Sequence, residues 1–189
     1  MDAAQMLQGK LKGLFLLNNE PEFDSAAGAQ AVAALGKVEM VVTLSPFKTN
    51  LEFSDVLLPI APFTETSGSF VNAEGRLQSF YAVVRPLGET RPGWKVLRVL
   101  GNLLGLQGFD FETSQDVLGR ATGAAVGSVS HVPQELLSNA VADMPQSVQV
   151  VDVPAPAVAS LYQLDGLVRR ATSLQLTTDA RLAREGVAA

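Results

Sequence analysis

The chain has 189 residues, a formal net charge of −5 at pH 7 and hydrophobic residues at 47% of its positions. This length and hydrophobic content suit one packed domain, with or without a tail, and exclude global disorder. Because 14 Lys and Arg residues are scattered among 19 acidic residues, the sequence offers no basic patch for nucleic acid.

Cysteine and histidine, the residue types that usually hold zinc and iron–sulfur clusters, are almost absent. With no cysteine, the chain has neither a disulfide nor a cysteine-ligated iron–sulfur or zinc site of its own. Its single histidine, His131, has no clustered carboxylates and is interpreted as a surface or capping residue. No apolar run reaches the ~18 residues of a transmembrane helix, so no direct membrane insertion is expected.

The first third of the sequence predicts an α/β unit. Helices are expected over residues 3–8 and 26–35, and one helical turn over residues 49–53. Short apolar runs predict strands buried on both faces, at residues 14–17, 40–44 and 56–58. Because helices and strands alternate with short connections, the pattern favours a layered, mostly parallel, Rossmann-like sheet with flanking helices.

After residue 59 the pattern changes to a β-hairpin followed by helices. The hairpin is predicted at residues 69–72 and 76–81. Helices are predicted at residues 94–104, 113–120 and 133–142. The predicted domains are an α/β domain over residues 1–142, a proline-containing linker over 143–159 and a helical or irregular tail over 160–189.

In such a fold a nucleotide would bind at the ends of the predicted strands. The sequence has neither G-x-G-x-x-G nor a P-loop. The turn after the first strand, Asn18 to Pro21, has no glycine and places the acidic Glu20 where a phosphate would lie. This turn is interpreted as a simple strand-to-helix connection, with a nucleotide site as the alternative.

Charged residues between Ser54 and Gln78 have two interpretations. Glu65, Glu74 and Arg76 are contacts for a cofactor or partner, or they form a buried ion pair that locks a turn, and the pattern favours the second. Asn72 is expected to bond to the backbone of that turn. Asp55 is expected to accept nearby backbone N–H bonds or to cap a helix, and it has no His or Ser partner for catalysis.

Two clusters of basic residues stand out. Trp94, with its basic neighbours, is interpreted as the anchor of a core helix whose cations extend along its outer side, and the alternative is a nucleic-acid platform. Arg169 and Arg170 are compatible with docking onto an acidic surface, although most such pairs are solvated. Asp110 and Glu112 need not face each other, so they predict no acid–base pair.

The run SDVLLPIAPFTETSGSFVNAEGRLQ, residues 54–78, resembles a segment of the molybdopterin-oxidoreductase superfamily. That segment has Ala-Asp-Val-Val-Leu-Pro, a Glu, a Gly-Thr-Phe-like step and Asn-x-Glu-Gly-Arg-x-Gln. The order of elements over residues 5–105 and the tail LDGLVRRATSLQLTTDA are similar to the large iron–sulfur subunit of bacterial NADH-quinone oxidoreductase, respiratory complex I, a branch without molybdenum. The chain resembles the C-terminal part of that subunit.

The resemblance implies a structural, cofactor-free portion with no catalytic, cofactor-binding or metal residues of its own. The parent chain would carry electrons from NADH to quinone through iron–sulfur clusters located elsewhere in it. The implied partners are other subunits of the peripheral arm of complex I, on the cytoplasmic side of the bacterial inner membrane. Self-association of the isolated chain through exposed apolar surface is a further expectation.

The alternative is the C-terminal half of a molybdopterin-dependent, formate-dehydrogenase-like oxidoreductase. Residues near Asn18–Pro21 and Ser45–Thr49 would then touch the cofactor. In the molybdenum enzymes the first turn often reads Gly-x-Asn-Pro, whereas here Asn18 takes the Gly place and Glu20 replaces the Asn. Such an enzyme is expected to continue into a β-barrel, which residues 147–151 could begin. A free-standing α/β binding module is the third reading.

Overall fold

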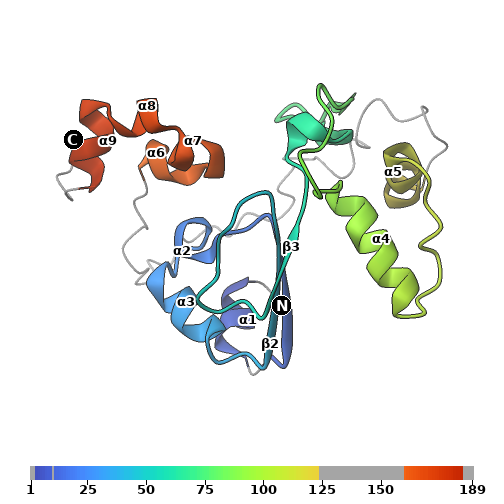
Figure 1. The fold of residues 1–189 in the computed structure, drawn as a ribbon, viewed down its shortest axis with the longest axis horizontal. Helices are drawn as coiled ribbons and strands as arrows, with labels where there is room; N and C mark the ends of the chain where they lie inside the picture. The colour runs from blue at the N-terminus through green and yellow to red at the C-terminus, as the bar shows by residue number, and fades with distance from the viewer. Residues whose placement is uncertain (1–2, 10, 124–159, 185–189) are drawn as a thin grey trace, which may run out of the picture. The chain divides into compact units, whose positions relative to one another are not determined.

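The computed structural model describes residues 3–9, 11–123 and 160–184 (Figure 1). The described residues form two compact units: the first contains the described residues up to 58 together with residues 160–184, and the second contains residues 59–123. His131, the predicted helix at 133–142, the predicted linker and the strand-like run at 147–151 lie outside the described residues.

The first unit is built on a three-stranded sheet (Figure 1). Its strands are β1 (Gly13–Leu17), β2 (Met40–Ser45) and β3 (Val56–Pro59), in the order β1-β2-β3. β1 and β2 run parallel, with Gly13 opposite Met40 and Leu17 opposite Leu44. All three strands coincide with the predicted apolar runs, and the predicted α/β class with a parallel sheet and a hairpin is confirmed.

Three helices accompany this sheet: α1 (Ala3–Gln8), α2 (Pro21–Asp24) and α3 (Ala29–Leu35). α1 matches its prediction, but the helix predicted from residue 26 begins three residues later. Gly28 precedes α3 with a φ of 49°, a left-handed conformation that interrupts a helix. The added helix α2 begins at Pro21, whose fixed φ suits a first helical position.

The core of the first unit lies between the sheet and its helices. Leu16, Leu35 and Val41 form a buried cluster, against which Leu7, Leu14, Val38 and Phe53 pack. β2 is buried on both faces as predicted, but β1 is not, since Phe15 and Leu17 are 53% and 50% exposed. Alternate side chains of a strand point to opposite faces, and at this edge strand the described residues cover mainly the side facing the helices.

Asp55 ties the start of β3 to β2. Its backbone N–H donates to Val41 O at 2.9 Å, and its Oδ2 accepts from the Val41 N–H at 2.7 Å. The first of the two interpretations of Asp55, an acceptor for backbone N–H groups, is therefore confirmed. Val41 is fully buried, whereas Asp55 is exposed, so a surface carboxylate satisfies the N–H group of a buried residue.

Replacing Asp55 with Ala is expected to lower the free energy of unfolding by about 1–3 kcal/mol, because the Val41 N–H loses its partner. Asp55→Asn keeps an acceptor oxygen and is expected to lose less. Urea denaturation of both variants tests the prediction. An Ala variant as stable as the original chain would contradict it.

The second unit contains an antiparallel hairpin and two longer helices. The hairpin pairs β4 (Gly68–Val71) with β5 (Leu77–Phe80), after a short 3-10 turn at Phe63–Glu65. The helices are α4 (Gly93–Leu103) and α5 (Ser114–Thr122), close to their predicted bounds. Thr113 caps α5 in a capping box with Asp116.

The tail contributes four short helices to the first unit: α6 (Leu161–Leu164), α7 (Gly166–Arg170), α8 (Thr172–Gln175) and α9 (Thr178–Arg184). The sequence predicted helical pieces over this stretch but not their number. Across the part of the chain that the structure describes, no helix is both long and apolar enough to span a membrane.

Candidate functional site

The candidate site consists of the two turns that follow β1 and β2, Asn18–Pro21 and Ser45–Thr49, here called the strand-end turns. Because β1 and β2 are parallel, both turns lie at the same edge of the sheet. Thr49 Oγ1 donates to Glu20 Oε2 at 3.1 Å, which joins the two turns. The structure thus brings together the residues to which the molybdenum-enzyme hypothesis assigns the cofactor.

Asparagines shape this edge of the sheet. Asn18 and Asn50 adopt left-handed φ values of 49° and 59°, which Asn tolerates better than most residues. Asn50 Nδ2 also donates to Asn19 O at 2.9 Å. The carbonyl of Asn50 accepts from the N–H groups of Phe53 and Ser54, so the predicted turn over residues 49–53 is present as a single hydrogen-bonded turn.

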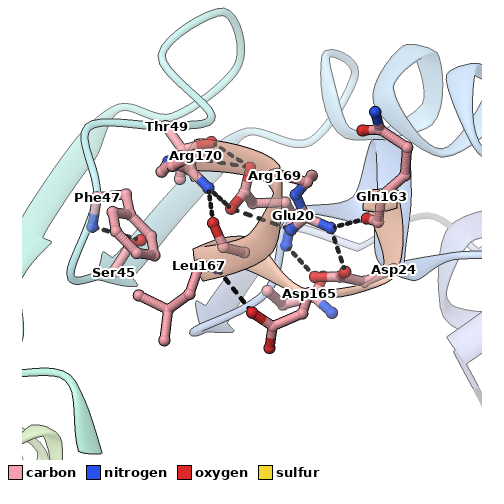
Figure 2. A network of polar contacts seen from close by, with 12 residues as sticks. Glu20, Asp24, Ser45, Phe47, Thr49, Gln163, Asp165, Leu167, Arg169 and Arg170 are labelled. Carbon is pink, nitrogen blue, oxygen red and sulfur yellow. Dashed lines mark hydrogen bonds and ion pairs between the residues drawn. The ribbon is translucent and has the colours of Figure 1, made fainter. Parts of the chain in front are cut away.

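Glu20 is the centre of the site, and it is held by two arginines of the tail (Figure 2). Arg170 binds it with both nitrogens, Nη1 to Oε1 at 2.8 Å and Nη2 to Oε2 at 3.0 Å. Arg169 Nη2 lies 3.1 Å from Oε1. Such two-point contacts between Arg and a carboxylate are the strong, oriented form of the ion pair.

Each arginine has a further acidic or aromatic partner. Arg169 Nη1 lies 3.3 Å from Asp24 Oδ1, and its guanidinium stands 4.6 Å from the centre of the Phe23 ring. The Arg170 guanidinium stands 4.0 Å from the centre of the Phe47 ring. Cations over aromatic rings gain an attraction of their own. We call the set Glu20, Asp24, Arg169 and Arg170, with the rings of Phe23 and Phe47, the arginine clasp.

Local structure holds α7 in place for these contacts. Asp165 caps the helix, with Oδ1 accepting from the N–H groups of Leu167 at 2.8 Å and Val168 at 3.1 Å. A Cβ at Gly166 would lie 3.4 Å from both Glu20 Oε1 and the Phe47 ring, so a glycine eases the close approach. The buried Gln175 of α8 donates to Val168 O at 2.8 Å, and this bond joins α8 to α7.

Burial raises the pKa of Glu20, but hydrogen bonds from Arg170 and Arg169, together with their charge, outweigh burial and hold its pKa below the usual 4.5. The clasp is thus expected to give stability that is fully present above pH 4.5 and is lost as the pH falls through the lowered pKa. Thermal unfolding of the chain and its Glu20→Gln variant, from pH 7 down to about pH 3, checks this. The difference between them should shrink at the acidic end, and a constant difference would contradict the prediction.

A cavity of about 250 Å³ adjoins Glu20 in the first unit. Its wall includes the carboxylates of Glu20, Glu22 and Glu52 and the ammonium of Lys48. Because Glu20 is already paired with two arginines, the remaining charges of the lining are two carboxylates and one ammonium, and this balance does not favour a phosphate. Among the described residues, no group of three or more His, Cys, Asp or Glu side chains is placed to hold a metal ion.

The charged residues of the 54–78 segment do not form the predicted buried ion pair. Glu74 and Arg76 are exposed, and the turn is held instead by Asn72 Oδ1, which accepts from their N–H groups at 3.0 and 2.8 Å. The role predicted for Asn72 is therefore confirmed. Glu65 Oε2 accepts from the Leu87 N–H at 2.9 Å. The ion pair is absent because a side-chain amide satisfies the turn without burying charge.

The residues around Trp94 have a structural role in the second unit. Trp94 is half-buried at the start of α4, with Lys95 Nζ 5.3 Å from its ring centre. Arg98 pairs with Glu112 at 3.1 Å. This geometry agrees with the predicted helix anchor with its cations on the outer side.

Two curated proteins are similar to part of this chain. A probable oxidoreductase of Bacillus subtilis is 33% identical over 114 residues, 60% of this chain and 12% of that protein. A putative formate dehydrogenase of Staphylococcus aureus is 33% identical over 98 residues, 51% of this chain and 10% of that protein. The chain thus spans about a tenth of the length of these relatives.

The solved structures point to the same fold. Acetylene hydratase from Pelobacter acetylenicus superposes with a TM-score of 0.50 at 21% identity, over 57% of this chain and 15% of that one. At that identity the likeness concerns fold alone. Residues 1–103, more than half of the 189-residue chain, match the molybdopterin oxidoreductase family. The chain belongs to the molybdopterin oxidoreductase family.

Proposed function

We propose that this chain is a cofactor-free, structural portion of an oxidoreductase subunit. Its parent would be the large iron–sulfur subunit of a bacterial NADH:quinone oxidoreductase. The observation that carries the cofactor-free part of the proposal is the arginine clasp, whereas the choice of parent rests on the resemblance of residues 5–105 and of the tail. The strand-end turns, where the competing hypothesis assigns a pterin cofactor, are bound by α7 of the same chain.

The residues at the strand ends do not fit an anionic pterin nucleotide. A phosphate at a strand end needs free N–H donors and close backbone approach, usually over glycine. Here Glu20 presents a carboxylate, and Arg169 and Arg170 are already paired with it. The neighbouring cavity adds the like charges of Glu22 and Glu52. We therefore assign no cofactor to the strand-end turns.

In the proposed parent, electrons pass from NADH to quinone through iron–sulfur clusters held outside this chain. Its partners would be the other subunits of the peripheral arm, on the cytoplasmic side of the bacterial inner membrane. Exposed apolar side chains support contact with other protein surfaces, among them Phe15 and Leu17 in the first unit and Tyr81, Val83 and Leu87 in the second. The same side chains underlie the expected self-association of the isolated chain.

The second candidate is a formate-dehydrogenase-like molybdopterin oxidoreductase. The names of the relatives support this parent more than they support complex I, since they include a probable oxidoreductase and a putative formate dehydrogenase. The geometry of the clasp supports it less. In such an enzyme the cofactor would have to be held by residues other than those of the clasp.

Elemental analysis of the parent protein, purified from its own cells, separates the two candidates. Iron without molybdenum or tungsten, together with NADH-dependent quinone reduction by the assembled complex, is the result expected for the first. Stoichiometric molybdenum or tungsten, together with formate oxidation, would overturn it in favour of the second.

A further inference from the structure

We infer that the strand-end turns form a recognition site for two adjacent arginines, and that its occupant is α7 of the same chain, held in cis. The inference goes beyond the proposed function, because it rests on contacts within the first unit and applies to either candidate parent. The inferred ligand is a basic peptide, and it binds at a sheet edge whose charges do not favour a phosphate.

The two arginines have different partners in this site. Arg170 meets the carboxylate of Glu20 with both terminal nitrogens and lies over Phe47. Arg169 bridges Glu20 to Asp24 and lies over Phe23. Neighbouring side chains on a helix point in directions about 100° apart, so two separate subsites are needed to bind an adjacent pair.

The geometry selects arginine rather than lysine. Only a planar guanidinium can give two parallel hydrogen bonds to Glu20 and also stack on a ring. Within this chain, Arg169 and Arg170 are the one place in the sequence where two basic residues are adjacent. The chain thus offers a single segment that fits both subsites.

Burial distinguishes this contact from an ordinary surface ion pair. The side chains of Arg169 and Glu20 are 7% and 10% exposed, whereas that of Arg170 is 34% exposed. Arg169 also donates to the carbonyl of Gln163, so the helix before α7 completes its environment (Figure 2). The guanidinium of Arg169 is therefore buried and held in one geometry by two carboxylates, unlike a solvated cation on the surface.

Occupation in cis has a measurable consequence. Since occupant and site belong to one chain, the occupant binds as an intramolecular partner at an effective concentration that a free peptide at micromolar concentration does not reach. A free peptide at micromolar concentration should therefore bind weakly to the original chain. It should bind well to a chain whose own α7 has lost the two arginines.

The test uses the full chain and a fluorescently labelled peptide of residues 160–184, followed by fluorescence anisotropy. The peptide is expected to bind the R169A/R170A chain at least about tenfold more tightly than the original chain. A matched peptide with both arginines changed to lysine should bind the R169A/R170A chain at least about tenfold more weakly than the arginine peptide. The E20Q/R169A/R170A chain should not bind either peptide.

Equal binding to the original and R169A/R170A chains, or binding that survives Glu20→Gln, would overturn the inference. Circular dichroism checks that the variant chains are folded. If R169A/R170A does not fold, the full-length R169K/R170K chain, which keeps both charges, takes its place in the same comparison. A dimer of the original chain that becomes monomeric in the R169A/R170A chain would overturn the assignment in cis, because it would place α7 on the other copy.

Discussion

Glu20→Gln is expected to lower the free energy of unfolding of the first unit by about 2–4 kcal/mol, because two arginines lose the carboxylate they share. The change keeps the shape of the side chain and one acceptor oxygen, so the effect isolates the charge. Arg169, with a side chain only 7% exposed, is then left with Asp24 as its acidic partner. Urea denaturation followed by circular dichroism measures the loss.

Glu22 provides the matched control, since it lies in the same short helix α2 and is exposed. Glu22→Gln is expected to change stability by less than about 0.5 kcal/mol. Release of α7 should also speed trypsin cleavage after Arg169 and Arg170 in the Glu20 variant alone. Equal effects of the two substitutions on stability and on cleavage would show that the clasp is no stronger than a surface ion pair.

The elements that the sequence predicted well are those whose signals are local. The apolar run that became β2 is buried on both faces, and a short apolar run of that kind is sufficient evidence for a strand. Thr113 and Asp116 stand three residues apart at the start of α5, the spacing of a capping box. Gly105, just beyond α4, has a φ of 70° that favours glycine.

The predictions that failed have different causes. The apolar run of β1 does not reveal that Phe15 and Leu17 lie on a face that the described residues leave exposed. A helix was predicted across Gly28 because the alanines around it outweighed one glycine. The buried ion pair expected near Glu74 is replaced by backbone bonds to a neutral amide.

The arginine clasp could not be predicted from the local sequence pattern. Glu20 and Arg170 are 150 positions apart in the sequence, so no periodicity joins them. Two signals were nevertheless present: an acid in a turn where the resemblance to the molybdenum enzymes implies Asn, and two adjacent arginines compatible with an acidic surface. Sequence reasoning placed that surface on a partner or favoured solvation, whereas the structure places it on the same chain.

A second large effect is expected in the second unit, where Gly101→Ala should be destabilising although Ala favours helices. Gly101 is buried in α4, and a Cβ there would lie 2.5 Å from Cδ1 and 2.6 Å from Cγ of the Phe109 ring. Forcing extra volume into such a contact costs about 1–3 kcal/mol. The gain in helix propensity offsets only about 1 kcal/mol of this cost. The net loss should therefore be up to about 2 kcal/mol.

The single tryptophan of the chain, Trp94, lies in the same helix, so its fluorescence during urea unfolding reports on this unit. Leu103→Ala, at a position 79% exposed on α4, is the control and should change stability by less than about 0.5 kcal/mol. Removing the ring with Phe109→Ala should abolish the penalty, so that Gly101→Ala becomes neutral or stabilising in that background. If Gly101→Ala stabilises the chain while Phe109 is present, the close contact between helix and ring does not limit this packing.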